Sequence, residues 1–398
     1  MQLIRKSIFC RAAVAAAWSW ATCSLSTWTA AQEPHIELIG QGTVSGTASD
    51  LSGLSDNLET GGRADQFGGL SAIEYSGEPG RFFALSDRGP GDGAARFECR
   101  FHELKLTLDP QSKKIECTIL KTTLFRNHEG KSLSGSLEAP AADEQSHASA
   151  GSRQALDPEG FRLLGNECLV SDEYGPRVSI FNSDGSWLRD LSLPARCRLN
   201  ASPQPGSSGV FPNRGLEGIT VDHKSGTIIA ALQGPLIEDG ALENGKCFGV
   251  NTRWFAIDRS GQVKQFVYQL DDESSGVSEV LHWDTDRVLV LERDSLTGVE
   301  AKIKRIYVAE LSDASDVSDI ASLPRKGLPE SIKPVSKRLL IDLLDSRFGL
   351  GGEQAAEKPE GLCWGPLQPN GARTLWLSVD NDFDPEVTTK FYAFSIRE

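Results

Sequence analysis

An internal repeat constrains this chain more than any other feature of its sequence. A short motif with an acidic or hydroxyl side chain, which contains glycine in four of its five copies, opens an apolar run five times. The five openings are Gly68-Gly-Leu-Ser71, Asp157-Pro-Glu-Gly-Phe161, Gly215-Leu-Glu-Gly-Ile219, Val277-Ser-Glu-Val280 and Lys358-Pro-Glu-Gly-Leu362. In each unit a turn and a second apolar run follow, and this run ends in a polar cluster. The clusters are Ser86-Asp-Arg-Gly-Pro90, Ser171-Asp-Glu-Tyr-Gly-Pro176, Gln233-Gly-Pro235, Glu292-Arg-Asp294 and Val379-Asp-Asn-Asp382. Such periodicity is typical of architectures that pack repeated units side by side.

The runs themselves have the composition of β-strands. They are short, rich in β-branched and aromatic residues, and bounded by Gly, Pro, Asp and Asn, as in 81–86 and 287–291. The glutamates at positions 159, 217, 279 and 360 are 58, 62 and 81 residues apart, which suits one four-stranded blade plus loops. We therefore predict an all-β chain that folds as a β-propeller of about six blades of antiparallel strands, with five or seven also compatible.

Two further expectations concern the ends of the repeat array. We expect a strand over 35–44 to join a strand over 391–396 in a closing blade. A weak helical period occurs only around 336–348, where four leucines could form one face.

The first 31 residues read as a signal peptide, with a cationic start at Arg5, Lys6 and Arg11 and small residues before a cleavage site after Ala31. We expect 32–398 to be a single propeller domain, with surface-loop insertions near 132–152 and 200–212. No later stretch is apolar for long enough to span a membrane. These features predict a monomeric protein that is secreted or periplasmic.

The charge balance narrows the class of partner. The chain has 41 Lys and Arg against 55 Asp and Glu, and its formal charge of −14 becomes −17 once three basic residues leave with the signal peptide. Nucleic acids and anionic membranes need a basic face, so they are poor partners for such a chain. A metal cation, or a substrate held through one, fits better.

Six cysteines remain after residue 31, and none forms a Cys-x-x-Cys pair. Cys197 and Cys247 are the best candidates for a disulfide, because both lie in polar inserts of an exported chain. The alternative is that several cysteines are buried thiols, above all Cys168 and Cys363.

Hairpin geometry would gather the acidic motifs at one end of the propeller. In an antiparallel hairpin the start of the first strand lies beside the end of the second. Glu159 should therefore meet Asp172 and Glu173, Glu279 should meet Glu292 and Asp294, and Glu360 should meet Asp380 and Asp382. If the first strands line the central channel, a ring of carboxylates crowds one mouth, and a cation must offset the repulsion.

These considerations give a candidate site. Oxygen ligands without clustered His or Cys favour a divalent ion such as Ca²⁺. The candidate metal ligands are Asp87, Asp172, Glu173, Glu279, Glu292, Glu360, Asp380 and Asp382. Glu159 and Glu217 are candidates for catalytic carboxylates, and Arg88, Arg177, Arg214 and Arg293 for holding an anionic group. The alternative for each arginine is an ion pair that stiffens a blade.

No nucleophile elbow, phosphate-binding glycine loop, zinc-protease motif or dinucleotide fingerprint occurs, and the six histidines are scattered. The sequence thus gives no support to a Ser-His-Asp hydrolase.

The motifs resemble the phytase-like family described as having esterase-like activity of phytase. The resemblance rests on 68–71, 83–90, 157–160, 170–177, 213–218, 291–294, 358–361 and 381–383, and it covers roughly 65 to 396. It implies a secreted or periplasmic propeller that hydrolyses a phosphate ester with the help of a divalent ion. The Gln233-Gly-Pro235 unit departs from the pattern, because it has no acid at the strand end.

Two classes of function remain open. One is a metal-dependent hydrolase of small anionic esters, with a calcium-dependent lactonase or arylesterase as a variant. The other is a non-catalytic binding or scaffold propeller whose acids and arginines only hold the blades together.

Overall fold

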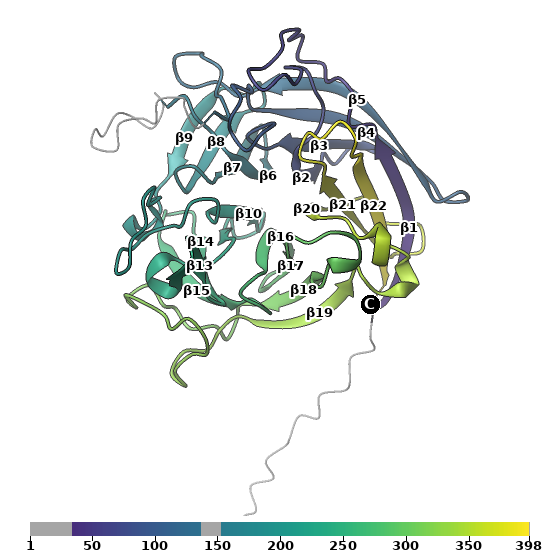
Figure 1. Ribbon diagram of the computed structural model, residues 1–398. Coiled ribbons are helices and arrows are strands. Elements are labelled where there is room, and N and C mark those ends of the chain that lie inside the picture. The colour runs from purple at the N-terminus through teal and green to yellow at the C-terminus, as the bar shows by residue number, and fades with distance from the viewer. Residues whose placement is uncertain (1–33, 137–152, 398) are drawn as a thin grey trace, which may run out of the picture. The chain divides into compact units, whose positions relative to one another are not determined.

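Five four-stranded antiparallel sheets make up the computed structural model of the chain, which describes residues 34–136 and 153–397 (Figure 1). Blade 1 consists of β2 (Leu70–Tyr75), β3 (Arg81–Ser86), β4 (Arg100–Asp109) and β5 (Lys114–Leu124). Blade 2 consists of β6 (Pro158–Leu164), β7 (Glu167–Asp172), β8 (Arg177–Asn182) and β9 (Trp187–Leu191). Blade 3 consists of β10 (Leu216–Val221), β11 (Ile228–Leu232), β14 (Asn251–Ile257) and β15 (Val263–Gln269). Blade 4 consists of β16 (Gly276–Asp284), β17 (Arg287–Arg293), β18 (Lys304–Glu310) and β19 (Ser336–Asp342).

Blade 5 is built from both ends of the chain. It contains β20 (Lys358–Trp364), β21 (Arg373–Asp380), β22 (Thr389–Arg397) and, as its outermost strand, β1 (His35–Val44). The pairing of β1 with β22 confirms the expected closure. The same closure explains why there are five blades rather than the preferred six: β1 completes the fifth repeat and adds no blade of its own. A single parallel pair, Gln41 with Lys114, links this blade to β5 of blade 1.

The innermost strands β2, β6, β10, β16 and β20 surround the centre, and each contacts the next one around the ring, with β20 returning to β2. Five apolar clusters fill the spaces between neighbouring blades. Between blades 1 and 2, for example, Phe101 packs against Phe161 at 5.3 Å between ring centroids. Because every blade buries both of its faces in this way, the blades stabilise one another around the ring.

The weak helical period around 336–348 did not predict the local structure. Residues Ser336–Asp342 form strand β19, and a 3₁₀ turn follows at Ser346–Phe348 (η5). Pairing with β18 outweighed the leucine spacing, because a strand here completes blade 4. The other 3₁₀ turns are η2 (Ala195–Cys197), η3 (Ile237–Asp239), η4 (Gly298–Glu300) and η6 (Gly352–Gln354), and no α-helix occurs within 34–136 and 153–397.

Other expectations meet the structure in part. Cys197 and Cys247 are both buried free thiols, so the expected disulfide is absent. The proposed signal peptide and most of the 132–152 insertion lie outside the described residues. The 200–212 insertion is a loop, but its end reaches the central cavity described below. Among the described residues, no helix has the length and apolarity needed to cross a membrane.

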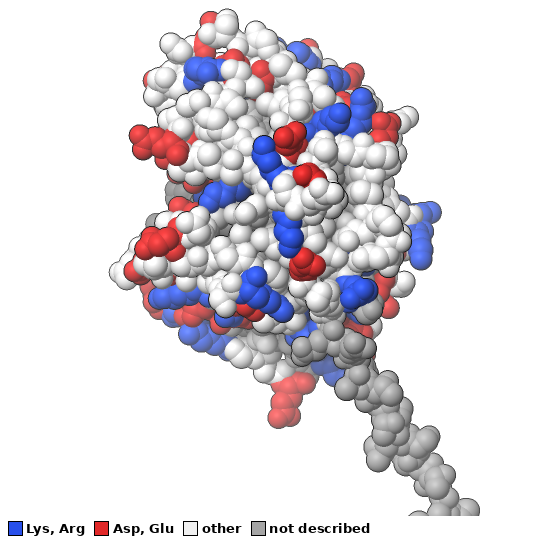
Figure 2. All heavy atoms as spheres, turned by 90° about the vertical axis from the view of Figure 1, so that its right-hand side faces the viewer, with Lys and Arg blue, Asp and Glu red and all other residues white. Residues whose placement is uncertain are grey.

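Blade 3 carries an extra hairpin between its second and third strands, formed by β12 (Ala241–Glu243) and β13 (Lys246–Phe248). On the face that Figure 2 presents, acidic and basic side chains are interspersed rather than gathered into a patch of one sign. The concentration of charge that distinguishes this molecule lies at its centre.

Candidate functional site

Each innermost strand has a register irregularity at its repeat motif. The shifts fall between Leu70 and Ala72, Pro158 and Phe161, Leu216 and Ile219, Val277 and Glu279, and Pro359 and Gly361. A bulge of this kind redirects a side chain out of the regular alternation. The pairing makes five residues structurally equivalent: Ser71, Glu159, Glu217, Ser278 and Glu360. The ring at the centre therefore holds three glutamates and two serines.

This equivalence corrects the predicted role of Glu279 in blade 4. The repeat pattern places Glu279 with Glu159, Glu217 and Glu360. In the structure it occupies the next position along, which is Gly160, Gly218 and Gly361 in the other blades. Glycine is needed there in blade 3, because a Cβ on Gly218 would lie 2.4 Å from the Val280 nitrogen of blade 4.

A cavity of about 850 Å³ opens at this end of the ring, and residues of all five blades line it. Nine of the fourteen predicted site residues lie on its wall: Asp87, Arg88, Glu159, Glu173, Arg214, Glu217, Arg293, Glu360 and Asp382. The predicted convergence of motif residues from different blades is therefore present in the structure. We call this space the mouth cavity.

Five predicted residues do not line the mouth cavity, and the structure gives four of them other contacts. Asp172 accepts hydrogen bonds from the backbone N–H of Asp157 and Tyr174. Asp380 is buried beside Lys358, 3.6 Å from its Nζ. Arg177 is half-buried at the start of β8.

The other two, Glu279 and Glu292, are held by buried partners. Glu292 accepts hydrogen bonds from the Tyr268 hydroxyl, the Ser275 hydroxyl and the Lys337 ammonium. Its predicted meeting with Glu279 fails, because the register pairs Glu279 with Leu291 and Glu292 with Val277.

Four carboxyl groups crowd together on the blade 2 and blade 3 side of the cavity, and we call Asp157, Glu159, Glu173 and Glu217 the acidic cluster. Burial raises the pKa of Glu159 well above its ordinary value, and the charges of Glu217 and Asp157 raise it further. Burial and the charge of Glu173 likewise raise the pKa of Glu217. Burial and Asp157 raise the pKa of Glu173 to about 7. The protein itself thus leaves this concentration of negative charge only partly compensated.

Asp157 was not among the predicted ligands, yet it completes the best candidate metal centre. One oxygen from each of Asp157, Glu159 and Glu173 lies within 4.8 Å of the other two. Asp157 is fully buried, and its Oδ1 has no hydrogen-bond partner. An unpartnered buried carboxylate oxygen beside two further carboxylates fits a hard divalent cation such as Ca²⁺. The sequence does contain one indication of this ligand, because blade 2 has an aspartate at a position where the other four repeats have Gly or Lys.

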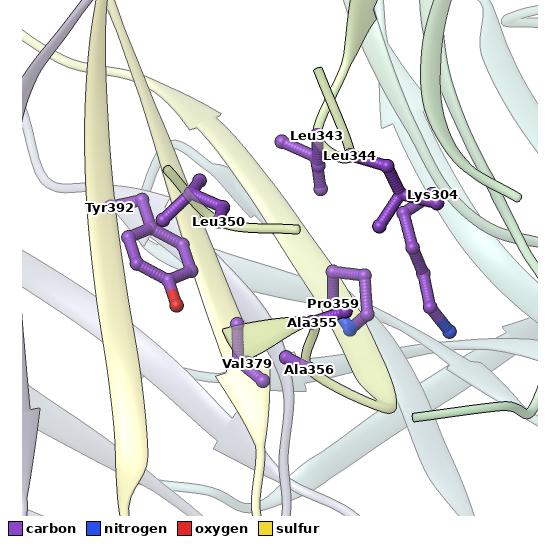
Figure 3. A pocket seen from close by; sticks show the side chains of 9 residues that line it. All are labelled: Lys304, Leu343, Leu344, Leu350, Ala355, Ala356, Pro359, Val379 and Tyr392. Carbon is purple, nitrogen blue, oxygen red and sulfur yellow. The ribbon is translucent and has the colours of Figure 1, made fainter. Parts of the chain in front are cut away.

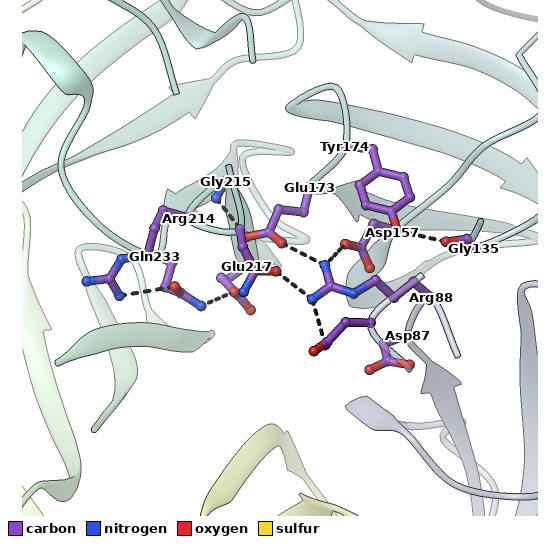
Figure 4. Close-up of polar contacts among 12 residues, drawn as sticks. Asp87, Arg88, Gly135, Asp157, Glu173, Tyr174, Arg214, Gly215, Glu217 and Gln233 are labelled. Carbon is purple, nitrogen blue, oxygen red and sulfur yellow. Dashed lines mark hydrogen bonds and ion pairs between the residues drawn. The ribbon is translucent and has the colours of Figure 1, made fainter. Parts of the chain in front are cut away.

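Arg88 offsets part of the negative charge of the acidic cluster. It donates to Asp157 Oδ2 at 2.5 Å and Glu173 Oε2 at 3.4 Å, and also to Asn213 and Asp92 (Figure 4). Burial alone would lower the pKa of Arg88, but the surrounding carboxylates raise it overall. In this structure Arg88 is therefore committed to carboxylates.

The remaining basic groups differ in their partners. Arg293 forms an ion pair with Glu360, and Lys358 forms one with Asp382. Arg214 instead donates to the neutral Gln233 Oε1 at 3.1 Å, and Gln233 in turn donates to Glu217. Figure 4 shows Gln233 and Glu217 between Arg214 on one side and Arg88 on the other.

A second group of charges lies further along the innermost strands from the mouth cavity. Arg162 of blade 2 lies 2.8 Å from Glu279 of blade 4 and 3.7 Å from Glu74 of blade 1, and it donates to the Val280 carbonyl. Blades 2 and 4 are not neighbours, so Arg162 reaches across the axis. We call Arg162, Glu279 and Glu74 the tunnel cluster.

A second cavity, of about 10 Å³, lies between blades 4 and 5 next to Leu343, Leu350 and Tyr392 (Figure 3). It has room for about one water molecule. The ammonium of Lys304 at its edge is already bonded to Asp294 and to the Glu357 carbonyl. The mouth cavity is therefore the candidate site.

Comparison with known proteins supports the choice of family. A protein from Arthroderma benhamiae described as an uncharacterized secreted protein is 25% identical to this chain. The alignment is 454 positions long and covers 87% of this chain and 86% of that protein. Among solved structures, the Malassezia sympodialis allergen Mala s 1 matches with a TM-score of 0.39 at 12% identity, covering 87% of this chain and 82% of its own. The RS223 β-xylosidase matches with a TM-score of 0.40 at 9% identity, covering 83% of this chain and 92% of the xylosidase chain. Both structural likenesses are too distant to bear on function. The family match spans residues 65–383, and the chain belongs to the phytase-like family described as esterase-like activity of phytase.

Proposed function

We propose that this protein is an exported hydrolase that cleaves phosphate esters and depends on a divalent cation. The observation that carries the proposal is the acidic cluster. Three of its four carboxyl groups, those of Glu159, Glu173 and Glu217, line a solvent-open cavity of about 850 Å³, beside basic side chains that suit an anionic substrate. The family description, and a relative described as secreted, agree with an exported esterase.

We place the cation at Asp157, Glu159 and Glu173, which would supply only oxygen ligands; the proximity of their carboxylate oxygens supports this choice. Bound there, a divalent ion would offset the cluster's charge and act as a Lewis acid toward a phosphoryl oxygen. In hydrolysis, a bond forms between a water oxygen and phosphorus, the ester P–O bond breaks, and the alcohol leaves with a proton.

Glu217 is suited to the proton transfer. It lies beside the proposed ligands without belonging to the three, and one of its oxygens accepts a hydrogen bond from Gln233. Its raised pKa means that, as a carboxylate, it is a stronger base than an ordinary glutamate. We assign it the proton of the attacking water.

The test uses the mature chain, stripped with a chelator and then supplied with Ca²⁺, Mg²⁺, Mn²⁺ or Zn²⁺. Substrates are p-nitrophenyl phosphate, bis-p-nitrophenyl phosphate, phytate, p-nitrophenyl acetate and a simple lactone. We expect metal-restored turnover of a phosphate ester, lost in Glu217→Gln and retained in Arg189→Gln, a half-exposed arginine outside the mouth cavity.

Two other outcomes would replace the proposal. Metal-restored turnover of the acetate or lactone alone would identify a carboxylic esterase. A rise in melting temperature with Ca²⁺ but no turnover of any ester would favour the scaffold function.

A further inference from the structure

The wall that blade 3 contributes to the mouth cavity differs from the rest. Its extra elements, the 200–212 loop and the β12–β13 hairpin, both reach the cavity. They bring Phe211, Pro212 and Phe248 to the lining, all of them half-exposed. The rest of the wall, from blades 1, 2, 4 and 5, carries most of the charged side chains, both acidic (Asp87, Glu159, Glu173, Glu360 and Asp382) and basic (Arg88, Arg293 and Lys358).

Arg214 stands on the same blade 3 wall. Its guanidinium has a neutral partner, Gln233, whereas Arg88, Arg293 and Lys358 each have a carboxylate partner. A glycine gives it room: a Cβ on Gly276 would lie 3.2 Å from Arg214 Nη1. Unlike those three groups, it can therefore take up an added anion without giving up a carboxylate.

The charge count limits how many anionic groups the cavity can accept. Nine acidic residues line it against five basic ones, and three of those five are already paired with carboxylates. A substrate with many phosphates would face net repulsion even after one divalent cation had bound. One anionic group next to the cation and Arg214 is compatible with this count.

We propose that the blade 3 wall recognises the substrate, with Arg214 binding a single phosphoryl group and Phe211, Pro212 and Phe248 contacting an apolar or aromatic alcohol portion. The substrate class is then a monophosphate ester of an apolar alcohol rather than a polyphosphorylated polyol. This inference rests on the proposed phosphoesterase function for the identity of the anionic group.

Binding can test the inference without turnover. Calorimetric titration of the Ca²⁺-supplemented mature chain would compare phenylphosphonate, methylphosphonate and inositol hexakisphosphate. We expect phenylphosphonate to bind at least tenfold more tightly than either of the others. Phe248→Ala should reduce its affinity to that of methylphosphonate, and Arg214→Gln should weaken both phosphonates about tenfold or more.

Control variants separate recognition from folding. Arg189→Gln and Leu367→Ala change half-exposed and exposed residues outside the cavity and should leave all three affinities unchanged. If Phe248→Ala does not fold, Phe211→Ala tests the same wall from a different element. Circular dichroism checks each variant.

The inference is wrong if inositol hexakisphosphate binds as tightly as phenylphosphonate, if none of the three binds, or if the phenyl preference survives loss of the aromatic side chain. Assaying p-nitrophenyl phosphate and phytate in the same samples distinguishes the two proposals. Turnover that favours phytate would overturn the inference and support the hydrolase. A phenyl preference that Phe248→Ala abolishes, without turnover of any ester by the unsubstituted chain, would support the inference and contradict the hydrolase.

Discussion

The acidic cluster and the tunnel cluster both gather carboxyl groups at the centre of the propeller, but these groups are neutralised in different ways. In the tunnel cluster, Arg162 lies 2.8 Å from Glu279, which also accepts backbone N–H bonds from Ile219 and Val280. In the acidic cluster, the largest influences on Glu159 all raise its pKa, and its neighbours are other acids.

This difference separates the carboxylates that stabilise the fold from those that belong to the candidate site. A buried acid with its own arginine and amide donors is satisfied within the chain, so removing a partner leaves an uncompensated charge. Buried acids that face one another across an open cavity cost stability until a cation arrives from solvent. Neighbouring positions of the same motif therefore differ in role: Glu279 supports the fold, whereas Glu159 and Glu217, one position earlier in their own repeats, belong to the site.

The largest effect should come from Glu159→Gln. This change removes one proposed metal ligand, and we expect metal-dependent turnover to fall by about a hundredfold or more. Because the lost charge was repelled by Glu217 and Asp157, the metal-free protein should melt at the same temperature or higher. Steady-state assays and calorimetric melting with and without Ca²⁺ measure both. A large loss of metal-free stability would instead place Glu159 among the structural acids.

Glu279→Gln should show the opposite pattern. It leaves the fully buried Arg162 with backbone carbonyls and the more distant carboxylate of Glu74, and we expect a loss of about 3–5 kcal/mol in the free energy of unfolding. Urea unfolding of the metal-free chain gives the value. The folded fraction should retain its Ca²⁺ response, and a neutral effect on stability would remove the distinction between the two clusters.

The pH dependence of metal-free stability is the next largest effect. Burial and Asp157 raise the pKa of Glu173 from 4.5 to about 7, so the folded protein keeps a proton that the unfolded chain loses. The folded state then binds more protons between pH 4.5 and 7, and stability falls as pH rises through this window. This pKa shift corresponds to a loss of roughly 3 kcal/mol in the free energy of unfolding, and the loss is complete above pH 7.

Melting curves from pH 4 to 8 would test this sign. Glu173→Gln should flatten the metal-free profile, and Ca²⁺ should offset the loss above pH 7 by binding the deprotonated form. Burial also raises the pKa of Glu279 to about 7, but Ca²⁺ should leave that contribution unchanged. Stability that rises with pH in the metal-free chain would contradict the assignment.

Much of this arrangement was readable from the sequence, because the repeat and the hairpin rule depend only on local spacing. They predicted the propeller, the closing strand and the gathering of Glu159, Glu217 and Glu360 at one cavity. The blade count depended on where β1 pairs, which is a contact between the chain's two ends.

What the sequence did not predict depends on register and on partners distant in the chain. The bulge in β16 leaves Ser278, not Glu279, at the position that faces the cavity. Glu279 is shifted by one residue and lies beside Arg162 instead. Likewise, nothing local indicates that Arg88 would be committed to Asp157 while Arg214 is left with a neutral glutamine.

The smallest effect concerns the strand contact that links the two clusters. Gly218 follows Glu217 of the acidic cluster, and a Cβ there would lie 2.4 Å from the Val280 nitrogen and 2.7 Å from Glu279 Cα of the tunnel cluster. Since backbone cannot yield as a flexible side chain can, Gly218→Ala should cost about 1–3 kcal/mol in urea unfolding and lower turnover by displacing Glu217. Gly62→Ala is the matched control, because its Cβ would meet no atom closer than 3.8 Å. Equal stability of the two variants would mean that the innermost strands have room to separate, and that the spacing of the clusters is not fixed by this contact.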